Sequence, residues 1–304
     1  MSPELLSFRK TTNPVSLMKF LKYSAGFLTL IILITTGSVL LPESWKASSG
    51  EIAIVSVEGV LMDSHDIVSQ LKDYRHNPKI RGIVLRIDTP GGAVAPAQEI
   101  YSEIMRLRAE KKIVYVSMGT VAASGGYYIA CAADYVLANP GTLTGSISAV
   151  MAFNNIEELS NKVGIKPAVI KSGKFKDVGS PMRAMKREER ELLQSVVDDV
   201  HKQFVNTVAK GRKLSVSEVN KIADGRIMTG QQALNLKLVD EMGGLEKTIN
   251  LLAKKIGVQG RPQVIEAKDK TPFFDWLLQG SLSNKLTKTL LTSTGPRLQY
   301  VWNP

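Results

Sequence analysis

The chain has 304 residues, 44% of them hydrophobic, with one cysteine, three histidines and a formal net charge of +11. A single cysteine excludes an internal disulfide framework, and histidines without ligand spacing argue against a metal site. The positive charge is spread along the chain without interleaved aromatic residues, so we interpret it as a solvated surface and not as a nucleic-acid site. Attraction to anionic lipid headgroups is the secondary interpretation. This length and hydrophobic content suffice for one large domain or two small ones.

The stretch at 23–42 is apolar and uncharged, and it is about long enough to cross a bilayer core. The preceding residues, 1–22, carry four basic side chains and one acidic side chain, an imbalance that predicts a cytoplasmic N-terminus. A cleaved signal peptide is the alternative, but the stretch ends in Leu41-Pro42 without a small-residue cleavage site. We therefore predict an uncleaved transmembrane signal anchor, a polar linker at 43–50 and an extracytoplasmic domain after it.

From residue 51 onward, short apolar runs alternate with segments of helical spacing. The strands are predicted at 52–57, 80–87, 113–116 and 135–138, and the helices between them at 67–75 and 97–111. Strands separated by helices of this length indicate βαβ crossovers and a mostly parallel sheet. In such a sheet, ligands bind at the carboxyl ends of the strands.

The remainder of the chain is expected to add smaller elements. The pattern predicts a strand at 167–170, a long helix at 186–212, a short helix opened by the capping box of Ser215 and Glu218, a helix at 229–236 and a strand at 238–240. The tail, 268–304, contains several aromatic residues. We favour its packing against the domain or a neighbouring subunit over its lying on a bilayer surface.

Two glycine-rich segments follow predicted strands. One holds Gly91-Gly92, and the other, 119–132, is a run of small residues around Ser124. Because both come at strand ends, we expect them to meet on one rim of the sheet. Taken separately, the first could be a plain turn and the second a helix N-cap. Together they indicate a nucleophilic hydroxyl beside free backbone N–H groups that could hold an oxyanion.

A serine nucleophile needs a base. His65, His76 and His201 are the conventional candidates, but their surroundings are typical of surface or packing histidines. The second possibility is a lysine from the glycine-punctuated segment 171–181. Such a lysine must be neutral, and lowering its pKa from ~10.4 to about 7 takes roughly 4–5 kcal/mol of differential desolvation. Burial in a closed cleft can supply that free energy.

Five short motifs occur in order along the chain. They are D-T-P-G-G (88–92), A-A-S-G-G-Y-Y-I-A (122–130), T-L-T-G-S-I (142–147), S-G-K-F-K-D-V-G-S-P (172–181) and L-V-D-E-M-G-G (238–244). Together they resemble the signal peptide peptidase A family, also called protease IV. The resemblance implies an α/β fold similar to the Clp protease proteolytic subunit and to crotonase, in which stacked ββα units assemble into rings.

The resemblance also implies a Ser/Lys dyad. Carried over by motif, Ser124 is the nucleophile, Lys176 is the general base with Lys174 as the fallback, and Gly92 and Gly125 are the oxyanion donors. Long members of the family hold two tandem copies, with lysine and serine in different halves, whereas this chain has one copy. Whether the dyad forms within one chain or between neighbouring chains is therefore open. The family chemistry implies no metal and no cofactor.

The domain organisation follows from the anchor and the resemblance together. We expect a cytoplasmic segment at 1–22, the transmembrane anchor at 23–42, the linker at 43–50, a Ser/Lys peptidase domain at 51–267 and the tail at 268–304. Ser146, close to the predicted rim, is assigned a structural or orienting role.

The implied function is that of a serine endopeptidase, anchored in the cell membrane as a homo-oligomeric ring, that degrades released signal peptides and other apolar peptides outside the cytoplasm. A crotonase-like acyl-CoA enzyme would share the fold, but its substrate is cytosolic. A Ser-His esterase would require one of the histidines to reach Ser124. A non-catalytic membrane-anchored scaffold would keep the fold without turnover.

Overall fold

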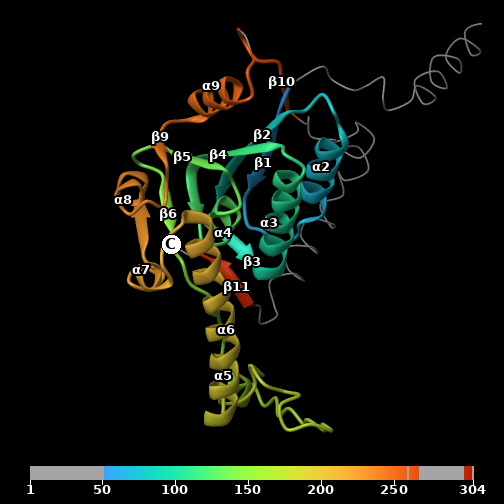
Figure 1. Cartoon of the computed structure of the whole chain (residues 1–304). Helices are drawn as coiled ribbons and strands as arrows, with labels where there is room; N and C mark the ends of the chain where they lie inside the picture. The colour runs from blue at the N-terminus through green and yellow to red at the C-terminus, as the bar shows by residue number, and fades with distance from the viewer. Residues whose placement is uncertain (1–50, 259, 267–297, 303–304) are drawn as a thin grey trace, which may run out of the picture. The chain divides into compact units, whose positions relative to one another are not determined.

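The computed structural model describes residues 51–258, 260–266 and 298–302 (Figure 1). The predicted cytoplasmic segment, transmembrane anchor and linker, 1–50, lie outside the described residues, as does most of the tail. Within the described ranges, no helix has the length and apolar character needed to cross a membrane.

The main sheet is parallel along its central path, in the order β10-β1-β2-β4-β5-β9. Its strands are β1 (Ile52–Glu58), β2 (Gly82–Thr89), β4 (Ile113–Ala123), β5 (Tyr135–Ala138), β9 (Glu241–Met242) and β10 (Val264–Glu266). Beside the end of β4 runs β6 (Leu143–Gly145), which pairs in antiparallel fashion with β8 (Ile227–Thr229). The prediction of a mostly parallel α/β sheet is confirmed, and the resulting sheet is mixed.

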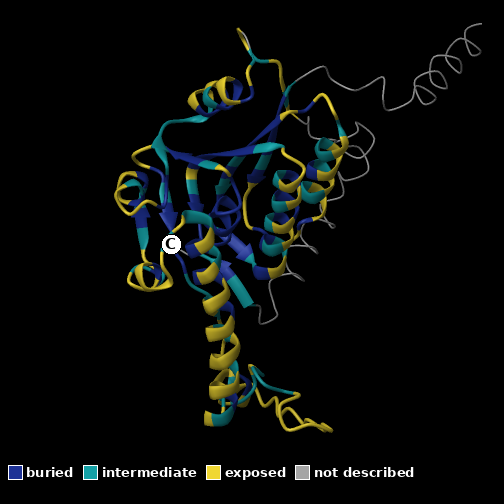
Figure 2. Ribbon diagram, in the orientation of Figure 1, coloured by how far each residue is buried: buried dark blue, intermediate teal, exposed yellow. Residues whose placement is uncertain are grey.

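Both faces of the sheet are buried, which explains why its strands are nearly continuous runs of Ile, Val and Leu. One face packs against α2 (His65–His76), α3 (Val94–Ala109) and part of α6 (Arg187–Arg212), and the other packs against α9 (Leu245–Lys255). Alternate residues of each strand go to opposite faces. In β1, for example, Val55 belongs to the first cluster and Ile54 to the second. Figure 2 shows the strands as the buried centre of the domain.

The remaining helices of the described residues have five or six residues each. They are α4 (Gly125–Ala130), α5 (Glu157–Lys162), α7 (Val216–Asn220) and α8 (Gly230–Asn235). The predicted capping box is confirmed, since the Ser215 hydroxyl accepts from the Glu218 N–H and the Glu218 carboxylate accepts from the Ser215 N–H. The C-terminal half of α6 is buried through Phe204 and its neighbours, whereas its N-terminal half is largely exposed (Figure 2).

Two predicted strands are wrong. Residues 167–170 form no strand, and Ile170 is fully exposed. The side chains there have the β-branched character of a strand, but no neighbouring strand among the described residues lies beside them to form a hydrogen-bonded ladder. The strand predicted at 238–240 is also wrong, because the parallel pairing with β5 begins only at Glu241.

A second, three-stranded sheet lies over the carboxyl ends of β2 and β4. Its strands are β3 (Gly91–Ala93), β11 (Leu298–Val301) and β7 (Val150–Met151), with β11 in the middle and antiparallel to both neighbours. Since β11 belongs to the predicted tail, the described end of the tail packs on the domain.

Candidate active site

Ser124 occupies the sharp turn between β4 and α4. Its backbone has φ 54° and ψ −114°, a combination that costs a non-glycine residue about 1–3 kcal/mol and is characteristic of functional sites. The turn is held by two backbone hydrogen bonds: the Ser124 N–H donates to the Gly145 carbonyl at 2.9 Å, and the Tyr128 N–H donates to the Ser124 carbonyl at 2.8 Å. The strain is therefore supported by β6 on one side and by the first turn of α4 on the other.

The Ser124 hydroxyl is buried and has no hydrogen-bond partner among the described residues. Ser124 is only 1% exposed. A buried hydroxyl without a partner costs about 1–3 kcal/mol, so structural roles rarely leave one in this state. A nucleophilic hydroxyl can stay buried without a partner, because the substrate supplies the group with which it reacts.

The glycine loop that carries Gly91 and Gly92 lies directly against the start of α4. A Cβ on Gly91, whose φ is +98°, would lie 2.7 Å from the Gly125 backbone nitrogen. A Cβ on Gly125 would lie 3.4 Å from the Gly92 nitrogen. The predicted meeting of the two glycine-rich segments is confirmed, and only residues without side chains permit such a close approach.

Two polar residues before the glycine loop hold it in place. The Thr89 hydroxyl accepts from the Gly91 N–H at 3.0 Å and donates to the Gly59 carbonyl. The Asp88 carboxylate accepts from the N–H groups of Thr120 and Val121 at 3.2 and 3.1 Å, which ties the glycine loop to the end of β4. The sequence motif alone assigns neither side chain a role. Their position at a strand end before Gly-Gly is the signal that could have identified them.

The short helix α4 is buried along its whole length. The Tyr127 hydroxyl donates to the Leu238 carbonyl at 2.9 Å, and burial raises the pKa of Tyr127 well above its usual value. Burial also raises the pKa of the Cys131 thiol to about 12. Cys131 is therefore a protonated packing residue at neutral pH, and it does not compete with Ser124 as a nucleophile.

Ser146 sits on the neighbouring strand end. β6 pairs Gly145 with Ala123, so that Ser124 and Ser146 each follow a residue of this pair. Ser146 also has a left-handed φ of 52°, is 6% exposed and donates its N–H to the Arg226 carbonyl at 2.8 Å. The two serines thus share burial and a positive φ on adjacent strand ends.

Lys176 is exposed on the segment between α5 and α6, and it forms no hydrogen bond with Ser124 within this chain. Lys174, the fallback, forms an ion pair with Glu188 and lies 5.4 Å from the ring centre of Phe175. The structure therefore brings together Ser124 and the glycine loop but does not bring either lysine to them.

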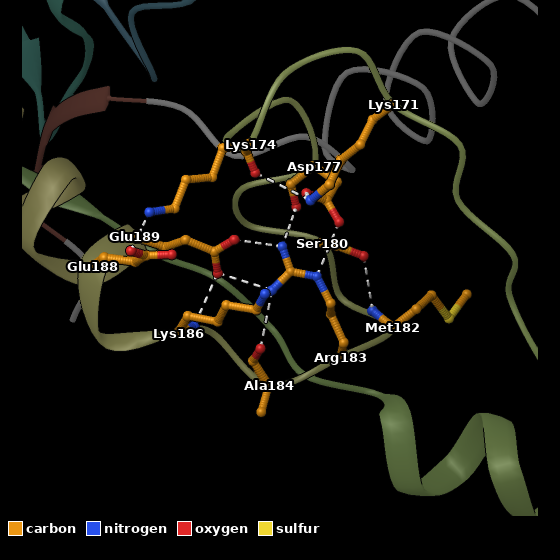
Figure 3. A network of polar contacts seen from close by, with 10 residues as sticks. All are labelled: Lys171, Lys174, Asp177, Ser180, Met182, Arg183, Ala184, Lys186, Glu188 and Glu189. Atoms are coloured by element: carbon orange, nitrogen blue, oxygen red, sulfur yellow. Dashed lines mark hydrogen bonds and ion pairs between the residues drawn. The ribbon is translucent and has the colours of Figure 1, made fainter.

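An ionic network fixes the segment that carries these lysines (Figure 3). The Arg183 guanidinium binds the Asp177 carboxylate at 3.0 Å and the Glu189 carboxylate at 2.5 Å, and Lys171 also contacts Asp177. Hydrogen bonding to Arg183 lowers the pKa of Glu189 to about 2 and holds the pKa of Asp177 well below its usual value. Both carboxylates thus stay charged at neutral pH.

Replacing Arg183 by glutamine is expected to loosen this segment, because it leaves Glu189, only 2% exposed, without its cationic partner. Trypsin should then cleave after Lys174 and Lys176 several-fold faster than in the wild type. The matched control is Arg187→Gln, which breaks an ion pair whose arginine is 92% exposed. Equal cleavage rates in the two variants would show that the network does not hold the segment.

The three histidines lie on two of the helices that cover the sheet. His65 and His76 are the first and last residues of α2. His201 lies on α6 with a buried Nε2 that has no partner among the described residues. No histidine forms a hydrogen bond with the Ser124 hydroxyl in this chain.

Comparison with known proteins shows that two family models match this chain. Residues 106–259 match Peptidase family S49, and 51–143 match Clp protease. The chain is 45% identical over 195 residues to a candidate protease of Synechocystis, covering 64% of this chain and 70% of that protein.

Two further relatives carry more specific names. The chain is 34% identical over 246 residues to a candidate signal peptide peptidase SppA of Enterococcus faecium, which covers 76% of this chain and 71% of the relative. It is also 34% identical over 205 residues to the chloroplastic serine protease SPPA of Arabidopsis thaliana, covering 67% of this chain and 30% of the relative. The region matched to Peptidase family S49 contains both Ser124 and Lys176.

Proposed function

Because the chain belongs to the signal peptide peptidase A family of serine peptidases, Peptidase family S49, we propose that it hydrolyses peptide bonds with Ser124 as the nucleophile. The observation that carries this proposal is the buried, unpartnered Ser124 hydroxyl beside the loop of Gly91 and Gly92. The fold similarity to Clp protease agrees with it, since the matched residues include both of these elements.

In the proposed reaction, a neutral lysine accepts the proton of Ser124 as its Oγ attacks the peptide carbonyl carbon. The developing oxyanion is held by the backbone N–H groups of Gly92 and Gly125. The protonated lysine then delivers its proton to the leaving amine, and the acyl-enzyme forms. Water, activated by the same lysine, hydrolyses the ester and regenerates the serine. No metal or cofactor enters any step.

We assign the base to Lys176, supplied to Ser124 by a neighbouring copy of the chain. The exposure of Lys176 and the absence of a partner for the Ser124 hydroxyl among the described residues both support an arrangement across subunits. Burial between two subunits would also provide the desolvation that a neutral lysine needs. The proposed assembly is therefore a homo-oligomeric ring in which each interface completes one site.

The proposed substrates are released signal peptides and other apolar, extended peptides at the membrane. The apolar stretch at 23–42 would anchor the protein in the cell membrane, with the peptidase domain on the extracytoplasmic side. Anchoring would keep the active site near peptides that remain dissolved in the bilayer.

The test uses the full-length protein in detergent and a fluorogenic apolar peptide. Lys176→Ala is expected to lower kcat by about 10²–10⁴-fold, the usual contribution of a general base. The matched controls are Lys174→Ala and the triple variant of His65, His76 and His201 to alanine, both of which should keep substantial activity. If the triple variant were inactive while Lys176→Ala stayed active, a Ser-His mechanism would replace the proposed Ser/Lys dyad.

Mixing two inactive variants tests the arrangement across subunits. Subunits that carry Ser124→Ala retain Lys176, and subunits that carry Lys176→Ala retain Ser124. Mixed assemblies should recover activity if one chain supplies the lysine to the next. No recovery, in assemblies shown to contain both variants, would place the dyad within one chain.

A further inference from the structure

The strand β4 changes its neighbour along its length. Its first part, Tyr115–Ser117, pairs with β5, whereas its last part, Val121–Ala123, pairs with β6. Ser124 follows this last part directly. The position of its hydroxyl therefore depends on how the strand passes from one neighbour to the other.

A β-bulge lies at the point of change. On the edge that β4 shares with β2, Met118 faces Ile87, whereas Ala122 faces Thr89. Asp88 therefore stands alone opposite the three residues between Met118 and Ala122, which form the β4 bulge. A bulge bends its strand, increases the local twist and re-aims the side chains beyond it. Here the segment beyond the bulge is the end of β4, where the serine turn begins.

Side chains on both sides of β4 bind the backbone of the bulge. The Asp88 carboxylate, on β2, accepts from the N–H groups of Thr120 and Val121 at 3.2 and 3.1 Å. On the opposite edge, the buried Thr142 hydroxyl, just before β6, donates to the Gly119 carbonyl at 2.7 Å. Backbone groups that leave a regular ladder need other partners, because an unpaired buried group costs free energy. These two side chains supply the partners.

Gly119 gives the Asp88 carboxylate room over the strand. A Cβ on Gly119 would overlap this carboxylate, although the backbone at Gly119 has no left-handed φ. The glycine is therefore required for space and not for conformation. A carboxylate packed so closely on the bulge has little freedom to move, which makes it a suitable support for a fixed geometry.

We propose that Asp88 and Thr142 are positioning residues for Ser124, because they hold the β4 bulge in the shape that delivers the serine to the glycine loop. This inference rests on the proposed function. Asp88 also lies at the end of β2, which leads into the loop of Gly91 and Gly92. One carboxylate thus links the strand that carries the nucleophile to the strand that leads into the oxyanion donors. Neither side chain has to touch the substrate.

The size of the bulge shows why its shape matters. A strand advances about 3.3 Å per residue, so straightening two extra residues would shift the end of β4 by up to about 7 Å. Even a displacement of about 1 Å can lower a rate about 10²-fold when the reacting groups lose their alignment. The backbone of Ser124 adds to the demand, because its unusual φ and ψ persist only where the surroundings enforce them.

Asp134 offers a comparison on the same strand. At the other end of β4, the Asp134 carboxylate accepts from the Val114 N–H at 2.9 Å and from the Arg108 guanidinium at 2.7 Å. Asp134 thus binds the backbone of β4, as Asp88 does, but at the end away from Ser124. Equal substitutions at the two positions therefore separate general support of the strand from positioning of the nucleophile.

The experiment compares full-length wild type with Asp88→Asn and the matched control Asp134→Asn, using the fluorogenic apolar peptide. In Asp88→Asn, an amide donor replaces an acceptor beside the N–H groups of the bulge. We expect kcat to fall about 10²-fold while KM stays within about twofold of wild type. The rate at which a small fluorophosphonate labels Ser124 should fall in parallel. Asp134→Asn should keep both rates near wild type, although both variants should unfold at lower urea concentrations than wild type.

A second pair of variants covers the case in which Asp88→Asn does not fold. Thr142→Val removes the hydroxyl at nearly constant volume and should lower kcat about tenfold or more. Thr142→Ser keeps the hydroxyl and should retain most of the activity.

The outcomes distinguish this inference from the proposed function. If Asp88→Asn and Asp134→Asn have the same kcat, or if Thr142→Val and Thr142→Ser do, the positioning role is wrong and the proposed function stands. If cleavage by the wild type does not depend on Ser124, the proposed function is overturned, and the positioning role with it.

Discussion

Replacing Ser124 by alanine is expected to abolish peptide hydrolysis while leaving the fold as stable as in the wild type, or slightly more stable. Loss of the nucleophile should lower kcat by about 10⁴-fold or more. The same change removes a buried hydroxyl that has no partner among the described residues, which should return about 1 kcal/mol to the free energy of unfolding. Peptide hydrolysis and urea unfolding of the same preparation measure the two effects.

Ser146→Ala is the matched control for this prediction. Ser146 shares the left-handed φ and the burial of Ser124 on the adjacent strand end, so general damage to the rim would affect both variants. We expect Ser146→Ala to retain most of the activity. If Ser124→Ala cleaved peptides at the wild-type rate, or if Ser146→Ala alone were dead, the nucleophile would have to be reassigned.

Replacing Gly91 by alanine is expected to lower kcat by about 10²–10³-fold, the usual effect of losing one oxyanion donor. The new Cβ would lie 2.7 Å from the Gly125 nitrogen, and the backbone φ of +98° disfavours any residue with a side chain. The same Cβ would lie 2.0 Å from the Tyr300 carbonyl oxygen of β11, and because both atoms belong to the backbone, relief requires movement of the glycine loop or of β11. Steady-state kinetics together with thermal unfolding would separate this local shift from global destabilisation.

Gly141→Ala is the control for this second prediction. A Cβ on Gly141 meets nothing within 4 Å, so its effect on stability should stay within about 0.5 kcal/mol and its effect on kcat should be small. An unchanged kcat in Gly91→Ala would show that the glycine loop does not hold the oxyanion.

Some of this molecule could be predicted from sequence because the deciding interactions are local or periodic. The capping box of Ser215 and Glu218 joins groups three residues apart. The strands β1 and β2 were recognisable because burial on both faces demands continuous apolar runs. The meeting of Ser124 with Gly91 followed from topology alone, since parallel strands deliver their carboxyl ends to one rim.

The errors mark where local pattern misleads. The residues at 167–170 have the composition of a strand, yet a strand exists only when a neighbour supplies the other half of its hydrogen bonds. Among the described residues no such neighbour lies there, and Val169 and Ile170 are exposed. For the same reason, the supporting roles of Asp88 and Thr89 were missed, since their partners lie on other strands and loops.

By itself, the sequence determined the parallel α/β class, the family and the serine proposed as the nucleophile, because motif order and strand periodicity are properties of the chain. Only the tertiary structure decided what surrounds that serine. It placed Tyr300 against Gly91 and Gly125, and it left Lys176 exposed away from Ser124. Pairings between segments that are distant along the chain depend on how the whole backbone closes, and no local pattern encodes that closure.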